Sequence, residues 1–97
     1  MIILGFPVLD TKTTISEQWF KVLEEFEEVR QEIESVEIDH ERVISEMQDL
    51  IQAMVSLEYS MAKQLGMKEH FIQKRFDMWN NRHLEKMQRY KAERGWD

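Results

Sequence analysis

The sequence contains no cysteine, one proline and three glycines among its 97 residues. Without cysteine there is no disulfide, no thiolate metal ligand and no cysteine nucleophile, so any metal must be bound by oxygen or imidazole ligands. So few glycines and prolines argue against a β-sandwich, which needs many tight turns, and against a glycine-rich phosphate loop. The composition therefore favours long helices.

A long apolar run is also missing. The most apolar segment, at the N-terminus, is interrupted by Gly5 and Pro7 and is far shorter than the roughly 20 residues that span a bilayer. It has neither the basic flank nor the small-residue cleavage site of a signal peptide. We therefore expect a cytoplasmic protein with no membrane partner, in which this segment is a short extended arm lying on the domain or on a neighbouring subunit.

Charge is distributed unevenly along the chain, whose net charge is −6. Residues 1–67 carry 14 acidic and 5 basic side chains, whereas residues 68–97 carry 8 basic and 5 acidic ones. Because no wholly basic surface is available, we do not expect nucleic-acid binding. An acidic body with a basic tail suits a chain that folds onto itself, or one that holds cations and a polyanion together.

The first helix is expected to begin near Thr14, which forms a capping box with Glu17. It should end between residues 35 and 38. The apolar residues within this segment are spaced alternately four and three apart, which is typical of a packed amphipathic helix. They are Ile15, Trp19, Val22, Phe26, Val29, Ile33 and Val36.

Two further helices follow. Asp39 is a favourable N-cap for the second, and Gly66 is a favourable stop. Because the connection between the first two helices is short, they should be antiparallel neighbours. The third helix is expected from Lys68 to about Arg94, with an apolar stripe through Ile72, Phe76, Trp79, His83, Met87 and Tyr90.

The expected fold is therefore a single all-α domain over residues 1–97, with three main helices per chain. Three amphipathic helices cannot cover one another's apolar stripes completely. We expect a homo-oligomer, either a homodimer or a dimer of dimers, that completes a four-helix-type bundle core. Two residues within the stripes need an explanation: a buried Glu58 requires a partner, and His83 is interpreted as a core or interface histidine.

Carboxylates border the apolar stripes of the first two helices. Glu25 and Glu28 are three residues apart and share a helix face, as do Glu46 and Asp49. Two antiparallel helices can bring these pairs together, where mutual repulsion raises their pKa values until cations bind. Oxygen ligands of this kind favour Mg²⁺, with Mn²⁺ as a substitute. A solvated acidic face is the alternative interpretation.

The motif Glu-Glu-x-x-Glu at positions 24, 25 and 28, followed by Glu-x-x-Asp at 46 and 49, resembles that of the MazG-like all-α nucleoside triphosphate pyrophosphatases. The resemblance covers roughly residues 14–95. It implies Mg²⁺-dependent hydrolysis of a (deoxy)nucleoside triphosphate to the monophosphate and pyrophosphate, as in nucleotide-pool house-cleaning. It also implies that Glu25, Glu28, Glu46 and Asp49 are the metal ligands.

The same resemblance suggests further roles. Glu24 and Glu28 are the candidates for the catalytic general base. The family often uses a lysine and an asparagine downstream of the second motif to hold phosphate. The matching positions are Lys74, Asn80, Asn81 and Lys86.

Two other classes of protein also have acidic helices. A non-enzymatic helical interaction module would use the acidic face to dock a basic partner, and it would not require the paired motif. A di-iron or di-manganese carboxylate bundle requires Glu-x-x-His pairs. Neither carboxylate pair in this sequence contains histidine, so the sequence favours this last class least.

Overall fold

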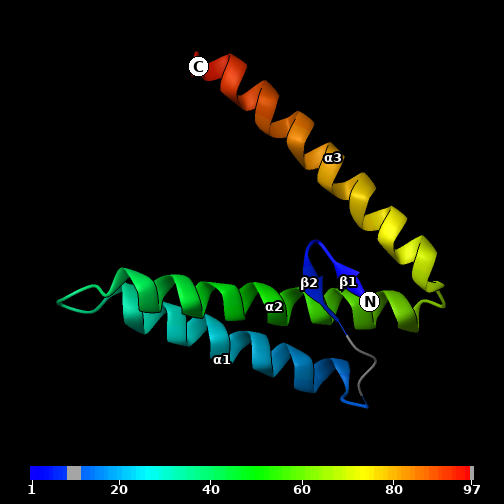
Figure 1. The fold of residues 1–97 in the computed structure, drawn as a ribbon, viewed down its shortest axis with the longest axis horizontal. Helices are drawn as coiled ribbons and strands as arrows, with labels where there is room; N and C mark the ends of the chain where they lie inside the picture. The colour runs from blue at the N-terminus through cyan, green and yellow to red at the C-terminus, as the bar shows by residue number, and fades with distance from the viewer. Residues whose placement is uncertain (9–11, 97) are drawn as a thin grey trace.

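A computed structural model describes residues 1–8 and 12–96, which form a small β-hairpin and three helices (Figure 1). The elements are β1 (Ile2–Ile3), β2 (Phe6–Pro7), α1 (Ile15–Ile33), α2 (His40–Gln64) and α3 (Glu69–Arg94). The expectation of a helical chain with three main helices is confirmed. None of the helices in the described part of the chain has the length and apolarity needed to cross a membrane.

Local capping explains where the first two helices begin. The Thr14 hydroxyl oxygen accepts a hydrogen bond from the backbone N–H of Glu17 at 3.1 Å. The Asp39 carboxylate accepts one from the N–H of Arg42 at 3.3 Å. Each bond satisfies an N–H group that has no partner within the helix. The short connection after α1 leaves α1 and α2 antiparallel and side by side (Figure 1).

The N-terminal segment is a hairpin and not the extended arm expected from its sequence. β1 and β2 pair antiparallel, with Ile3 opposite Phe6. Leu4 and Gly5 form the turn with positive φ angles of 52° and 81°, the backbone twist that two-residue hairpins favour. The hairpin buries Ile3 and Val8 almost completely.

The main core lies where this hairpin meets the C-terminal half of α2 and the first turns of α3. Tyr59 of α2 is fully buried, and its hydroxyl donates a hydrogen bond to the Glu69 carboxylate at 3.1 Å. The cluster consists of Ile3, Val8, Val55, Tyr59, Ala62, Ile72 and Phe76. Burying these side chains fixes the beginning of α3 against the end of α2.

Beyond Phe76, α3 leaves the body of the molecule as one continuous helix (Figure 1). Asn80 and Asn81, where the sequence allowed a break, lie within it without interrupting it. Every residue from 77 to 96 is exposed. The part of α3 from Asp77 to Arg94 is called the α3 arm below.

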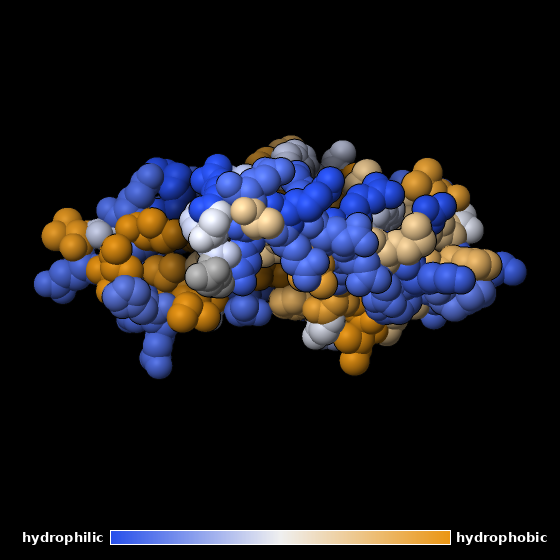
Figure 2. Space-filling model, turned by 90° about the horizontal axis from the view of Figure 1, so that it is seen from above, coloured by the Kyte–Doolittle hydropathy of each residue, from blue (hydrophilic) through white to orange (hydrophobic). Residues whose placement is uncertain are grey.

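Much apolar surface remains exposed on this single chain. Val22 and Val29 of α1 are buried, but Trp19 and Phe26 in the same expected stripe are 50% and 55% exposed. Figure 2 shows hydrophobic side chains at the surface near both ends of the view and along its lower edge. Large exposed apolar surface is typical of interaction sites.

The buried cluster predicts a clear difference between two truncations. Ile72→Ala removes a fully buried side chain and should lower the free energy of unfolding by about 2–5 kcal/mol. Val36→Ala, at a fully exposed position, should change it by less than about 0.5 kcal/mol. Urea denaturation followed by circular dichroism measures both. Equal effects would contradict the placement of α3 against the hairpin.

Candidate metal centre

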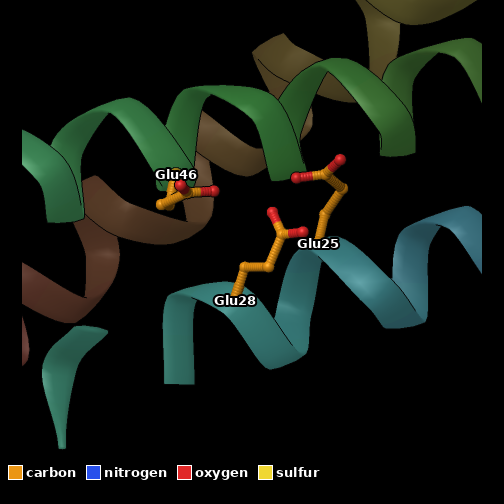
Figure 3. Close-up of side chains that lie close together, drawn as sticks. All are labelled: Glu25, Glu28 and Glu46. Atoms are coloured by element: carbon orange, nitrogen blue, oxygen red, sulfur yellow. The ribbon is translucent and has the colours of Figure 1, made fainter. Parts of the chain in front are cut away.

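Three carboxylates from two helices meet between α1 and α2 (Figure 3). Glu25 and Glu28 extend from α1, and Glu46 extends from α2. One oxygen of each side chain lies within 4.8 Å of the other two. These three residues are called the glutamate cluster below.

The positions of the apolar residues explain why the cluster forms. Val22 and Val29 of α1 are buried against α2, and Glu25 lies between them in sequence and on nearly the same face. Glu28 is one turn further along that face. On α2, Glu46 follows the buried Val43 by three residues. Packing the apolar residues therefore brings the acidic ones to the same interface.

The cluster lies in a partly buried environment. Glu25 is only 6% exposed, whereas Glu46 is half-buried and Glu28 is exposed. Burying a carboxylate is costly unless an opposite charge or hydrogen bonds compensate it. Lys21 supplies one such charge, because its Nζ lies 2.8 Å from Glu25 Oε1.

Two oxygens of the cluster have no such compensation. Glu25 Oε2 and Glu46 Oε2 are both buried without a hydrogen-bond partner among the described residues. Crowding has an electrostatic consequence, since hydrogen bonding with Glu46 favours the protonated form of Glu28, and the charge of Glu25 adds to this effect. Both raise the pKa of the Glu28 carboxyl above its ordinary value. The metal-free cluster therefore favours taking up positive charge, as a proton or as a cation.

Asp49, the fourth expected ligand, is exposed on α2 and is not one of the three residues whose oxygens meet. It lines a cleft of about 270 Å³ together with Glu25, Lys21 and Gln52. Glu25 therefore faces both the cluster and this cleft. Glu24, a candidate general base, has a side chain that is 69% exposed and is not one of the three clustered residues.

The expected phosphate-binding residues are not brought to the cluster within one chain. Lys74, Asn80, Asn81 and Lys86 are all exposed on α3. Asn80, Asn81 and Lys86 lie in the α3 arm, which diverges from α1 and α2 (Figure 1). They remain candidates only for a site that includes another chain or a different position of the arm.

Two further residues that the sequence placed within apolar stripes lie at the surface of the chain. His83 is exposed on the α3 arm, so it is not a core histidine within this chain. Glu58 lies at the surface of α2, yet partial desolvation by its neighbours raises the pKa of its carboxyl. Both residues are therefore available to an intermolecular contact.

Lys21 was not singled out from the sequence, although it contacts the most buried carboxylate. Its contact with Glu25 could have been predicted from the sequence, because side chains four residues apart are neighbours on a helix. The glutamates themselves provide hard oxygen ligands and have buried oxygens without partners. Their chemistry therefore fits a divalent cation such as Mg²⁺.

Comparison of the chain with protein-family models, with curated proteins and with solved structures found no match. The interpretation of the glutamate cluster consequently depends on its own geometry and on the motif that the sequence contains.

The raised pKa of Glu28 predicts a pH effect on the metal-free protein. A carboxyl whose pKa is raised by folding destabilises the folded chain at pH values above that pKa, and the penalty disappears as the pH falls through it. In EDTA, Glu28→Gln should therefore be more stable than wild type at about pH 7.5, and the difference should narrow toward about pH 5.5. Urea unfolding at both pH values measures it.

Glu34→Gln is the matched control for that experiment. Glu34 is the exposed C-cap residue of α1, and its carboxylate pairs with Arg30 at 2.6 Å. Losing this ion pair should give no gain in stability at either pH. If Glu28→Gln behaves like Glu34→Gln, the carboxylates of the cluster do not repel one another in solution.

Proposed function

We propose that this chain is an Mg²⁺-dependent nucleoside triphosphate pyrophosphohydrolase acting in the cytoplasm. The observation that carries the proposal is the meeting of Glu25, Glu28 and Glu46 from two helices, with two buried oxygens that lack partners in the part of the chain that the structure describes. The spacing of these residues within the two-part motif, which resembles that of the MazG-like enzymes, supports the same assignment.

The proposed ligands are the glutamate cluster together with Asp49, which lines the same cleft as Glu25. Mn²⁺ is the expected substitute for Mg²⁺, because both prefer carboxylate oxygens. When bound, the cation supplies charge neutralisation for the triphosphate and makes water more acidic. A solvated acidic face would not require carboxylates of two helices to converge at a partly buried interface.

In the proposed reaction, water adds to a phosphorus of the α–β anhydride and the bridging P–O bond breaks. The products are a nucleoside monophosphate and pyrophosphate, and the proton of the water passes to a carboxylate. Glu28 is the preferred acceptor over Glu24, because Glu28 belongs to the cluster whereas Glu24 does not. Holding the acceptor in place on a helix reduces the cost of orienting it.

The proposed active form is a homodimer or a dimer of dimers. Its support is the exposed apolar surface of α1 and α2, where Trp19, Phe26 and Met47 are all more than 40% exposed. A second copy would cover these side chains and complete a helical bundle core.

Binding of the cation should stabilise the protein. A ligand at 100 times its Kd adds about 2.7 kcal/mol to the free energy of unfolding, so saturating Mg²⁺ should raise the Tm relative to EDTA. Glu46→Gln should abolish this increase and should itself melt no lower than wild type in EDTA, because repulsion is relieved. Glu34→Gln should retain the full increase. A wild-type Tm that does not respond to Mg²⁺ or Mn²⁺ would favour an interaction module instead.

Hydrolysis should depend on the motif carboxylates and not on acidity in general. The variants Glu25→Gln, Glu28→Gln, Glu46→Gln and Asp49→Asn should each lose about 10²-fold or more of the rate of pyrophosphate release, since each removes an electrostatic group at the reaction centre. A panel of nucleoside triphosphates assayed with Mg²⁺ or EDTA measures this loss.

Glu27→Gln and Glu34→Gln are the controls for the hydrolysis assay. Glu27 lies on α1 with a side chain that is 44% exposed, Glu34 is the exposed C-cap residue of α1, and both pair with Arg30. They should change the rate by less than about threefold, as expected of surface charges. Equal losses in these controls, or release of orthophosphate in place of pyrophosphate, would overturn the proposal.

A further inference from the structure

The α3 arm continues an apolar stripe that is covered only at its beginning. Ile72 and Phe76 are buried in the main core. The same helix face continues through Trp79, His83, Met87 and Tyr90, since the residues follow one another at intervals of three or four. Trp79 is 46% exposed and Met87 is 55% exposed. A stripe that packs at one end and continues uncovered indicates that its cover comes from outside the described chain.

The arm does not reach back to its own α1 and α2. α3 is one continuous helix from Glu69 to Arg94, with its beginning fixed by the buried core. It points away from the α1–α2 pair (Figure 1). Folding the arm back within one chain would require breaking the helix, which would lose its backbone hydrogen bonds. Among the described residues, no segment of the same chain covers the arm.

The exposed side of α1 and α2 has the matching apolar pattern. Along α2, the exposed residues Ile44, Met47, Ile51, Met54, Met61 and Leu65 recur at intervals of three, four or seven, so they lie along one face. On α1, Trp19, Leu23, Phe26 and Ile33 are exposed as well. These two rows are called the α1–α2 face below.

The α3 arm also matches α1 in length and is opposite to it in charge. The arm has 18 residues and α1 has 19, so at 1.5 Å per residue both are about 27–28 Å long. The arm carries Arg82, Lys86 and Arg89 beside its apolar residues, whereas α1 is rich in glutamates. Opposite charges across an interface favour this pairing over the pairing of two acidic α1–α2 faces.

We propose that the α3 arm docks on the α1–α2 face of a second copy of this chain, and that the second copy returns its own arm in exchange. Each α1–α2 pair thereby gains a third helix from its partner. The exchange buries the uncovered stripe and brings basic side chains of one chain to the acidic helices of the other.

The absence of cysteine from the sequence makes a direct test possible. Met47→Cys places a thiol on the α1–α2 face, and Met87→Cys places one in the middle of the arm. The two single variants are mixed, allowed to exchange subunits and treated with a short bismaleimide. Arm exchange predicts a cross-linked dimer in the mixture, in at least fivefold higher yield than with either variant alone.

Gln31→Cys is the matched control, because Gln31 is exposed and lies nine residues from Val22, on the opposite side of α1. Mixed with Met87→Cys, it should give no dimer above background. Efficient cross-linking of Met47→Cys alone, without enrichment in the mixture, would show that two α1–α2 faces meet directly and would overturn the proposal. A wild-type protein that sediments as a monomer would overturn it as well.

A second variant tests the charges. The double variant Lys86→Glu, Arg89→Glu should weaken dimerisation at least tenfold at low salt, measured by sedimentation, whereas Glu85→Gln on the same arm should not. An unchanged dimer would contradict the pairing of arm and acidic helices. Neither measurement depends on hydrolysis. If the cross-link does not form but Mg²⁺-dependent activity is present, the arm exchange alone is rejected. The cross-link without activity would reject the proposed function alone.

Discussion

The burial of Glu25 between α1 and α2 is the constraint on which the rest of this molecule depends. Its side chain lies where an apolar residue would pack, and within residues 1–8 and 12–96 only one of its oxygens has a cationic partner, Lys21. Glu28 and Glu46 add two more carboxylates to the same interface. Replacing such groups by apolar residues often stabilises a protein. Packing alone therefore does not explain why carboxylates lie between the helices.

The same interface explains why a single chain leaves so many apolar side chains exposed. α1 and α2 pack through Val22, Val29 and Val43, which leaves their other apolar residues exposed. The main core lies at the far end of α2, where it holds the hairpin and the beginning of α3. A two-helix pair that carries buried charge needs further apolar cover, and a small domain has little core of its own to supply it. Assembly with a second copy would provide that cover and exclude water from the carboxylates.

Much of this arrangement could be predicted from the sequence. The helix beginnings at Thr14 and Asp39 depend on local hydrogen bonds, and the approach of Glu25, Glu28 and Glu46 follows from helical periodicity and a short connection. The hairpin could not be predicted, because its strands have two residues each and show no alternation. The position of Asp49 outside the glutamate cluster could not be predicted either. It depends on the rotation of α2 about its axis, which tertiary packing sets. The direction of α3 depends likewise on the contacts of Ile72 and Phe76.

Binding of Mn²⁺, followed by electron paramagnetic resonance, tests the central claim most directly, because the free ion gives a strong signal that diminishes when protein binds it. The account predicts saturable binding to the wild-type protein, competition by Mg²⁺, and loss of binding in Glu25→Gln and Glu46→Gln but not in Glu34→Gln. A free-ion signal that the wild-type protein leaves unchanged, or equal binding by Glu25→Gln, would contradict the assignment of a metal centre between α1 and α2.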